Sequence, residues 1–252
     1  MRRTIICLFM ALAMYGVYMY TLPEKVSEEA AMASVEAQIS AQLTLPAKRV
    51  YAVALGIYDS EEEARPDAAA YALRGAAGYI VETNDGWALL GAAYASEGEA
   101  ASVCSQLRKD EDIDAQVILF SADEVRIGLT AARTQTDVIT EALDMLEDIP
   151  GELMQLAAQI DAGQCGTDTA QSLMAVKHTE CVKLRDRLSD ALGNTADIFS
   201  RLVETELMEL CDMIAIVGDE EGPRGLSFSS WLKQAALETE LGIVNLMNTL
   251  SR

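Results

Sequence analysis

The sequence lacks the residues from which most catalytic and metal sites are built. It has one histidine, His178, and five cysteines with no Cys-x-x-Cys pair, whereas a structural zinc site needs about four nitrogen or sulfur ligands in a closed set. Cys181 lies three residues after His178, but a Cys-His pair acts as a nucleophile only with an orienting partner and an oxyanion donor. Glycine-rich phosphate loops are absent too. The sequence therefore predicts no enzyme activity, no metal and no cofactor.

Positive charge is also scarce. The 252 residues include 19 Lys and Arg against 40 Asp and Glu, which gives a net charge of −21. Binding to DNA or RNA phosphates needs clustered Lys and Arg that displace counterions, so we expect no nucleic-acid partner. Hydrophobic residues make up 50% of the chain, which is enough for one or two packed domains.

The cysteines predict no disulfide framework. Cys7 falls in the first apolar run, and the spacing of Cys104, Cys165, Cys181 and Cys211 fixes no pairing. A disulfide among these four is chemically permitted if they lie outside the cytoplasm. Cys181 and Cys211 fit the apolar sides of helical segments and are interpreted as core residues. We expect Cys165 to be the most exposed of the four.

A long run without charge lies at the N-terminus. Thr4–Leu22 has nineteen residues, which at roughly 1.5 Å per residue are enough to cross a hydrocarbon core about 30 Å thick. Two arginines precede the run and acidic residues follow it, so the positive-inside rule places everything after Pro23 outside the cytoplasm. Ala11-Leu12-Ala13 has the small-x-small form of a signal-peptide cleavage site, but the apolar run continues well past it. We expect residues 1–22 to be an uncleaved, single-pass anchor in the cell membrane.

The next segment, residues 23–48, has the spacing of a helix. Apolar residues recur at steps of three and four amid Ala, Glu and Gln, from about Ser27 to the residue before Pro46. This spacing predicts one amphipathic helix, which we interpret as a linker that holds the rest of the chain away from the membrane. The apolar positions are Met32, Val35, Ile39 and Leu43.

A short phrase then occurs twice. LGIYDSEEEA at Leu55–Ala64 returns as LGAAYASEGEA at Leu90–Ala100. The first copy follows a stretch rich in β-branched and aromatic residues, Arg49–Tyr58, which predicts a half-buried strand. Each phrase is therefore interpreted as a junction between a strand and a helix.

Both phrases contain the capping-box pattern, Ser60 with Glu63 and Ser96 with Glu99. In this pattern the serine hydroxyl accepts a hydrogen bond from the backbone amide of the glutamate, and the carboxylate accepts one from the backbone amide of the serine. Each cap is worth about 1 kcal/mol. We expect these four residues to be structural caps at the starts of two helices.

The segments between and after the junctions complete a βαββαβ order. Ala68–Ala77 predicts a helix, NDG at Asn84–Gly86 predicts a hairpin turn between two strands, and Ala115–Phe120 predicts a last strand. This order is that of an α+β, ferredoxin-like domain, with both helices on one face of a four-stranded antiparallel sheet. Because Pro66 falls within the first helix, that helix is expected to kink or to start late.

The duplicated pattern resembles the SPOR (sporulation-related repeat) domain family. The usual first strand of that family is similar to aromatic-x-Val-Gln-hydrophobic-Gly-Ser-Phe, and here Tyr51–Tyr58 reads YAVALGIY. The second phrase of the family, hydrophobic-Gly-Pro-Phe followed by Ser and acids, is similar to Leu90–Glu97. The chain departs from the family at Ala54, where Gln is usual, and at Ile57 and Ala92, where Ser and Pro are usual.

The resemblance covers about residues 49–121 and implies a function. SPOR domains are modules outside the inner membrane that bind peptidoglycan, especially glycan strands stripped of peptides at division sites, often behind one transmembrane helix. The resemblance therefore implies a membrane-anchored, extracytoplasmic protein that binds peptidoglycan glycan strands, with a role in cell division or sporulation.

Strand alternation selects candidate glycan-binding residues. If Tyr51, Val53 and Leu55 pack on the helices, the opposite face of the sheet is free and apolar, and an aromatic ring there could stack on a sugar. The same face suits a covered interface, so the alternative is a non-catalytic envelope scaffold whose sheet face packs on its own helical domain or on a partner protein. The candidate residues of the free face are Ala52, Ala54, Trp87 and Leu89.

The pattern changes over residues 122–252. Strand signals stop, and apolar residues recur at helical spacing, with breaks at Asp161–Asp168 and Gly218–Ser227 and a weaker one at Gly193-Asn194. This predicts three or four amphipathic helices in an antiparallel bundle domain with charged, solvated outer faces. We expect this domain to contact a protein partner or a second copy of the chain.

Overall fold

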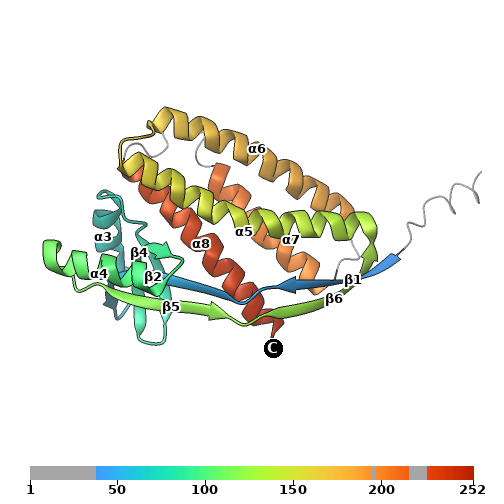
Figure 1. Cartoon of the computed structure of the whole chain (residues 1–252), viewed down its shortest axis with the longest axis horizontal. Helices are drawn as coiled ribbons and strands as arrows, with labels where there is room; N and C mark the ends of the chain where they lie inside the picture. The colour runs from blue at the N-terminus through green and yellow to red at the C-terminus, as the bar shows by residue number, and fades with distance from the viewer. Residues whose placement is uncertain (1–37, 194–196, 216–225) are drawn as a thin grey trace, which may run out of the picture.

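The computed structural model describes residues 38–193, 197–215 and 226–252 (Figure 1). The predicted anchor, residues 1–22, and residues 23–37 of the predicted linker lie outside this part of the chain. None of the helices within these ranges is long and apolar enough to span a membrane. The described residues form an α+β structure with two antiparallel sheets and six helices.

Four strands and two helices follow one another in the predicted order. The strand order in the sheet is β3-β4-β2-β5, and all neighbouring strands are antiparallel. This confirms the ferredoxin-like βαββαβ arrangement. The elements are β2 (Lys48–Tyr58), α3 (Glu61–Ala72), β3 (Tyr79–Thr83), β4 (Gly86–Tyr94), α4 (Glu97–Glu111) and β5 (Gln116–Ala122).

The glycines of the repeated phrase allow close packing in the two central strands. A side chain at Gly56 would collide with the ring of Tyr58, and a side chain at Gly91 would press against Leu55. The register between β2 and β4 also shifts twice between Val53 and Gly56, which is typical of a β-bulge. The shift changes which residues of β2 and β4 share a face of the sheet.

Both helices of this module begin at the expected serines. The Ser60 hydroxyl accepts from the Glu63 amide at 3.3 Å, and the Ser96 hydroxyl accepts from the Glu99 amide at 3.3 Å. The Ser96 hydroxyl also donates to the Glu99 carboxylate at 2.9 Å. Each cap satisfies an amide in the first turn, which has no partner inside the helix.

Proline does not delay the start of α3. The helix begins at Glu61 and contains Pro66, so of the two expected outcomes, a kink or a late start, the late start does not occur. The Ser60 cap and three glutamates in the first turn stabilise a start ahead of the proline, because their negative charges face the positive end of the helix dipole.

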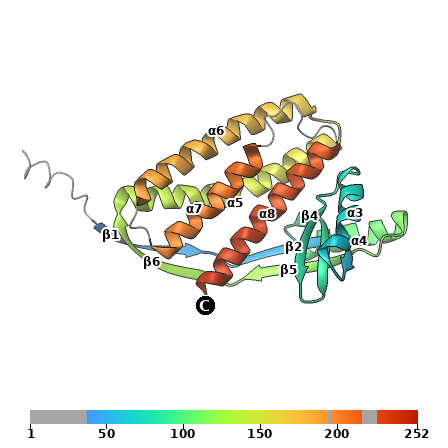
Figure 2. The same ribbon diagram turned by 180° about the vertical axis from the view of Figure 1, so that it is seen from behind.

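A two-stranded sheet extends the central strands. β1 (Gln38–Leu45) pairs antiparallel with β6 (Val125–Ala132), and this ribbon leads from β2 and β5 along the helices (Figures 1 and 2). The prediction of a helix over residues 23–48 is therefore wrong for Gln38–Leu45. The expectation that no strand follows residue 122 is wrong as well.

The spacing of apolar residues in β1 fits both a helix and a strand. Ile39 and Leu43 are four residues apart, a separation that keeps side chains on one side of a helix and also of a strand. Ala41 and Leu45 complete an alternation in which every second residue is half-buried. Hydrogen bonding to the distant β6 decides between the two, and this pairing is not visible in the local pattern.

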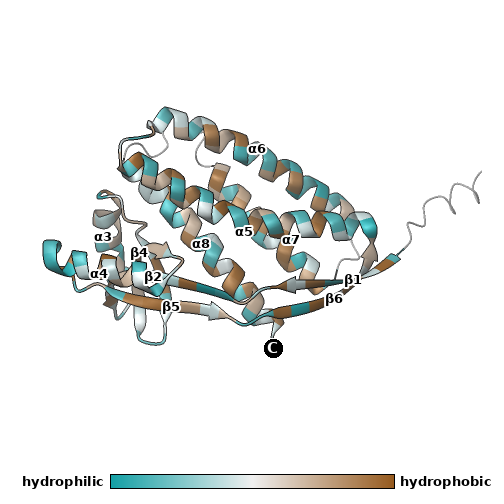
Figure 3. Ribbon diagram, in the orientation of Figure 1, coloured by the Kyte–Doolittle hydropathy of each residue, from teal (hydrophilic) through white to brown (hydrophobic). Residues whose placement is uncertain are grey.

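Four helices follow β6. Apolar and polar residues alternate around α5 and α7 in Figure 3, and the apolar sides of the helices meet in one core that includes the inner side of the β1–β6 ribbon. The prediction of three or four amphipathic helices is confirmed. They are α5 (Arg133–Asp161), α6 (Thr167–Leu192), α7 (Ile198–Ala215) and α8 (Leu226–Leu250).

The last helix, α8, belongs to both halves of the molecule. Phe228 and Leu232 are buried in the core of the bundle, whereas Leu237 packs on the four-stranded sheet. Figure 2 shows α8 running diagonally past the strands. The helical half is therefore joined to the sheet through a shared core.

Candidate functional site

The face of the sheet opposite α3 and α4 is covered by α8. Leu237 packs here with Ala52, Ala54, Ala88 and Leu90, and all five residues are 0% exposed. The small alanine side chains leave room for a helix to lie close to the strands. Ala52 and Ala54 are covered in this arrangement, so the prediction that they lie on a free face is wrong.

The other two candidates lie on the opposite face. Leu89 is fully buried beneath α3 and α4, and Trp87 shares its side of β4 at the end of the strand, opposite Tyr58. The prediction that all four residues share one free face is therefore wrong. Register explains the error: Ala54 pairs with Leu90 rather than with Leu89, because of the shift in β2 and β4.

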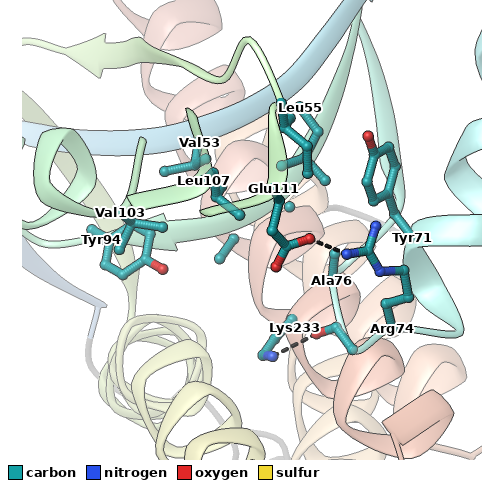
Figure 4. Close-up of a pocket in the computed structure, with 14 residues that line it drawn as sticks. Val53, Leu55, Tyr71, Arg74, Ala76, Tyr94, Val103, Leu107, Glu111 and Lys233 are labelled. Atoms are coloured by element: carbon teal, nitrogen blue, oxygen red, sulfur yellow. Dashed lines mark hydrogen bonds and ion pairs between the residues drawn. The ribbon is translucent and has the colours of Figure 1, made fainter. Parts of the chain in front are cut away.

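A hollow remains open between α3 and α4. This α3–α4 cavity has a volume of about 200 Å³ and is drawn in Figure 4. Its floor is formed by β2 and β4, and its sides by the two helices and the loop that follows α3. Its lining is largely apolar and aromatic, with Val53, Leu55, Tyr71, Tyr94, Val103 and Leu107.

An ion pair closes one side of the α3–α4 cavity. Arg74, after the end of α3, pairs with Glu111 at the end of α4, and the two point toward each other in Figure 4. The Arg74 guanidinium lies 5.7 Å from the centroid of the Tyr71 ring, within the range of a cation–π contact. Because the two side chains are 56% and 39% exposed, the pair adds little to stability. Its charged groups can therefore exchange partners with a ligand.

The helix α8 adds a second cation to the rim. Lys233 donates to the Gly75 carbonyl and to the Asp161 carboxylate, both at 2.5 Å. Ser230 donates to the Ala76 carbonyl in the same loop. These contacts fix the loop after α3 against α8, so the rim of the cavity depends on both halves of the molecule.

Tyr94 lines the cavity from the end of β4. Burial raises the pKa of its phenol, with smaller contributions from Cys104 and Glu99. The hydroxyl therefore stays protonated at neutral pH and can donate a hydrogen bond. Aromatic and apolar walls with a few placed donors are the usual lining of a small-ligand site, and they suit the apolar faces and hydroxyl groups of a sugar.

The described residues contain no catalytic arrangement around the histidine. His178 is half-buried on α6, and the Cys181 thiol donates to the Leu207 carbonyl of α7 at 3.9 Å. A hydrogen bond with Cys211 and burial raise the pKa of Cys181, so it is a thiol rather than a nucleophilic thiolate. Over the ranges that the structure covers, no group of three or more His, Cys, Asp and Glu side chains is placed to hold a metal ion.

The four cysteines within the described ranges are free thiols. Cys165 is half-buried, whereas Cys104, Cys181 and Cys211 are buried. This agrees with the interpretation of Cys181 and Cys211 as core residues and of Cys165 as the most exposed of the four. None of these thiols lines the α3–α4 cavity.

Comparison with known families identifies the first module. Residues 44–119 match the family model of the SPOR domain, from the end of β1 into β5. The match confirms the resemblance drawn from the repeated phrase. SPOR domains are peptidoglycan-binding domains linked to cell division, and they bind rather than catalyse. No curated protein and no solved structure gave a significant match.

Proposed function

We propose that this chain, which contains a SPOR domain at residues 44–119, binds glycan strands of peptidoglycan and has no catalytic activity of its own. The observation that carries the proposal is the family match over a complete βαββαβ module. The α3–α4 cavity supports it, because it is an open, aromatic hollow on this module. The face covered by α8 is excluded as the binding surface unless α8 leaves the sheet.

We also propose that residues 1–22 anchor the protein in the cell membrane and that the rest is extracytoplasmic. The support is the uncharged run Thr4–Leu22 with arginines before it and acids after it. This orientation places the SPOR domain in the compartment that contains peptidoglycan. We propose a role in cell division or sporulation, and its support is the link of SPOR domains to cell division.

The test of binding is sedimentation of the full chain, in mild detergent, with purified peptidoglycan. We expect the protein to cosediment, and to do so more strongly after an amidase has removed the peptides. Tyr71→Ala takes away one aromatic wall of the cavity and should lower the bound fraction severalfold, since stacking on a ring contributes about 1 kcal/mol. Leu173→Ala, at an exposed position of α6, is the control and should bind like the wild type.

Thermal unfolding of both variants shows whether they are folded. A wild-type chain that stays in the supernatant with either form of peptidoglycan would refute glycan binding. A folded Tyr71→Ala variant that sediments like the wild type would instead exclude the α3–α4 cavity as the contact surface.

The packing of α8 on the sheet favours a second function, a non-catalytic envelope scaffold. Leu173 and Val176 of α6 are 52% and 58% exposed and line a hollow of about 310 Å³ between α5 and α6. Such a surface is typical of a protein contact, either with a partner or with a second copy. Sedimentation equilibrium of the wild type and of Leu173→Glu tests the second copy, because a scaffold dimer through this surface becomes a monomer in the variant.

A further inference from the structure

A second hollow lies where the sheet meets the bundle. This junction cavity has a volume of about 330 Å³ and is lined by the start of β2, the end of β4, the middle of α5 and α8. Tyr94 lines both cavities. The helix α8 also reaches both, through Lys233 in the first and Glu240 in the second. Both hollows therefore border Tyr94 and α8.

The two cavities are more basic than the rest of the chain. The protein has a net charge of −21, yet each cavity is lined by two basic side chains and one acidic side chain. Local positive charge in an acidic protein favours an anionic ligand over a neutral one. The charged lining residues are Arg74, Lys233 and Glu111 in the α3–α4 cavity, and Lys48, Arg49 and Glu240 in the junction cavity.

Arg49 differs from the other three basic residues because its side chain forms no ion pair with a carboxylate of the described residues. Lys48 pairs with Glu240 at 2.7 Å, and Arg74 and Lys233 also have carboxylate partners. Arg49 is exposed and has no side-chain partner among the residues that the structure describes. A guanidinium binds a carboxylate through two parallel hydrogen bonds. The rim of the junction cavity thus presents a carboxylate receptor that the protein itself leaves empty.

We propose that the two cavities are consecutive subsites for a glycan strand that carries carboxylates, with Tyr94 between them and Arg49 binding a carboxylate of the strand. This proposal rests on the peptidoglycan binding proposed above. In a peptide-free strand every second sugar bears a lactyl ether with a free carboxylate, and the sugars between them bear only N-acetyl groups. Tyr71 and Tyr94 contact sugar faces, and the lactyl carboxylate lies against Arg49.

Because α8 covers one face of the sheet, the glycan strand is expected in the α3–α4 cavity and the junction cavity instead. Leu237 and the alanines beneath it are fully buried, so a glycan cannot reach the outer face without removing α8 from the core of both halves. The α3–α4 cavity and the junction cavity are open without any such movement. They also lie beside the same two strands, β2 and β4.

The experiment measures affinity by calorimetry with the full chain in mild detergent. The first probe is a peptide-free oligosaccharide of alternating N-acetylglucosamine and N-acetylmuramic acid, and the second is an N-acetylglucosamine oligomer of equal length without carboxylates. We expect the wild type to bind the first probe about tenfold more tightly, the effect of one charge-assisted hydrogen-bonded pair. Arg49→Gln should remove this preference and leave affinity for the second probe unchanged.

Two further variants sharpen the test. Arg126→Gln changes an exposed arginine of β6 that pairs with Glu124 and lies outside both cavities, so it should keep the wild-type preference. Tyr94→Phe keeps the ring but removes the hydroxyl between the subsites, and it should weaken binding of both probes severalfold. Thermal unfolding checks that each variant is folded.

The outcomes separate this inference from the proposed function. If the wild type binds neither probe, glycan binding itself fails and the subsites fail with it. If the wild type binds both probes equally, or if Arg49→Gln retains the preference for the carboxylated strand, the proposed subsites are overturned and glycan binding stands.

Discussion

Helices cover both faces of the SPOR sheet, but the centre of the sheet borders an open cavity on only one of them. On one face, α3 and α4 arise from the repeat itself, and large side chains such as Tyr71, Tyr94 and Leu107 border a cavity between them. On the other face, α8 comes from the far end of the chain, and its Leu237 packs on fully buried alanines of the central strands. The family match describes the sheet and its two helices, whereas the sequence outside the match decides which face a ligand can reach.

The largest expected effect on stability comes from disrupting the packing of α8 on the sheet. Leu237→Asp places a carboxylate among fully buried apolar side chains, and we expect it to lower the free energy of unfolding by at least about 4 kcal/mol. The measurement is urea denaturation followed by circular dichroism. Because α8 is shared by both cores, we expect both halves to lose stability together.

Leu173→Asp is the matched control for this substitution. Leu173 also lies within a helix but is 52% exposed, so the same chemical change should cost only about 1 kcal/mol. If the two variants have equal stability, Leu237 of α8 is not packed on the sheet. The face that contains Ala52 and Ala54 would then be accessible to a glycan.

The second prediction concerns three acidic residues of the neighbouring helices α7 and α8. Burial, and then the charge of Glu209, raises the pKa of Glu206 in α7 to about 7 from an ordinary 4.5. Its carboxylate lies so close to Gly242 of α8 that a side chain there would collide with it. Burial and the charge of Glu209 also raise the pKa of Glu238 in α8. None of these three acids pairs with a cation in the described ranges, unlike Glu111 in the α3–α4 cavity.

The sign of the pH dependence follows from these shifts. Because the pKa of Glu206 is higher in the folded state, folding favours the protonated acid, and stability falls as pH rises from about 4.5 to about 7. Glu206→Gln stays neutral, so it should exceed the wild type in stability at pH 8 by about 1 kcal/mol, a value reduced for the part of the side chain in water. Urea midpoints at pH 5 and pH 8 measure the change. Glu147→Gln, at an exposed site on α5, should show no such gain.

The sequence predicts the two halves of the molecule with different success. Local signals were sufficient for the βαββαβ module, because a capping serine, an acidic first turn and a hairpin turn act over a few residues. The two-stranded ribbon was missed at both strands. Alternation of Val125, Ile127, Leu129 and Ala131 in β6 was a visible signal, but strand pairing with β1 is a long-range choice.

The candidate site was missed for a related reason. Alternation correctly placed Val53 and Leu55 on the side of α3 and α4, but the register of β4 depends on the bulge near Gly56. The cover over Ala52 and Ala54 depends on a helix more than a hundred residues away in the sequence. The cavity itself is lined by five elements, β2, α3, β4, α4 and α8, and no single stretch of sequence contains its pattern.

The smallest expected effect on stability concerns the N-terminal cap of α4, on the face of the sheet that the two repeat helices cover. Ser96→Ala removes the hydroxyl that accepts from the Glu99 amide and donates to the Glu99 carboxylate, and it should lower stability by about 1 kcal/mol. Ser105→Ala removes a hydroxyl that only donates to the Ala101 carbonyl inside the same helix, so thermal unfolding should show no loss. Equal losses in both variants would mean that α4 does not depend on its cap. Because Leu107 and Glu111 lie at the other end of α4, Ser96→Ala should lower stability while leaving the glycan affinity of the folded protein unchanged.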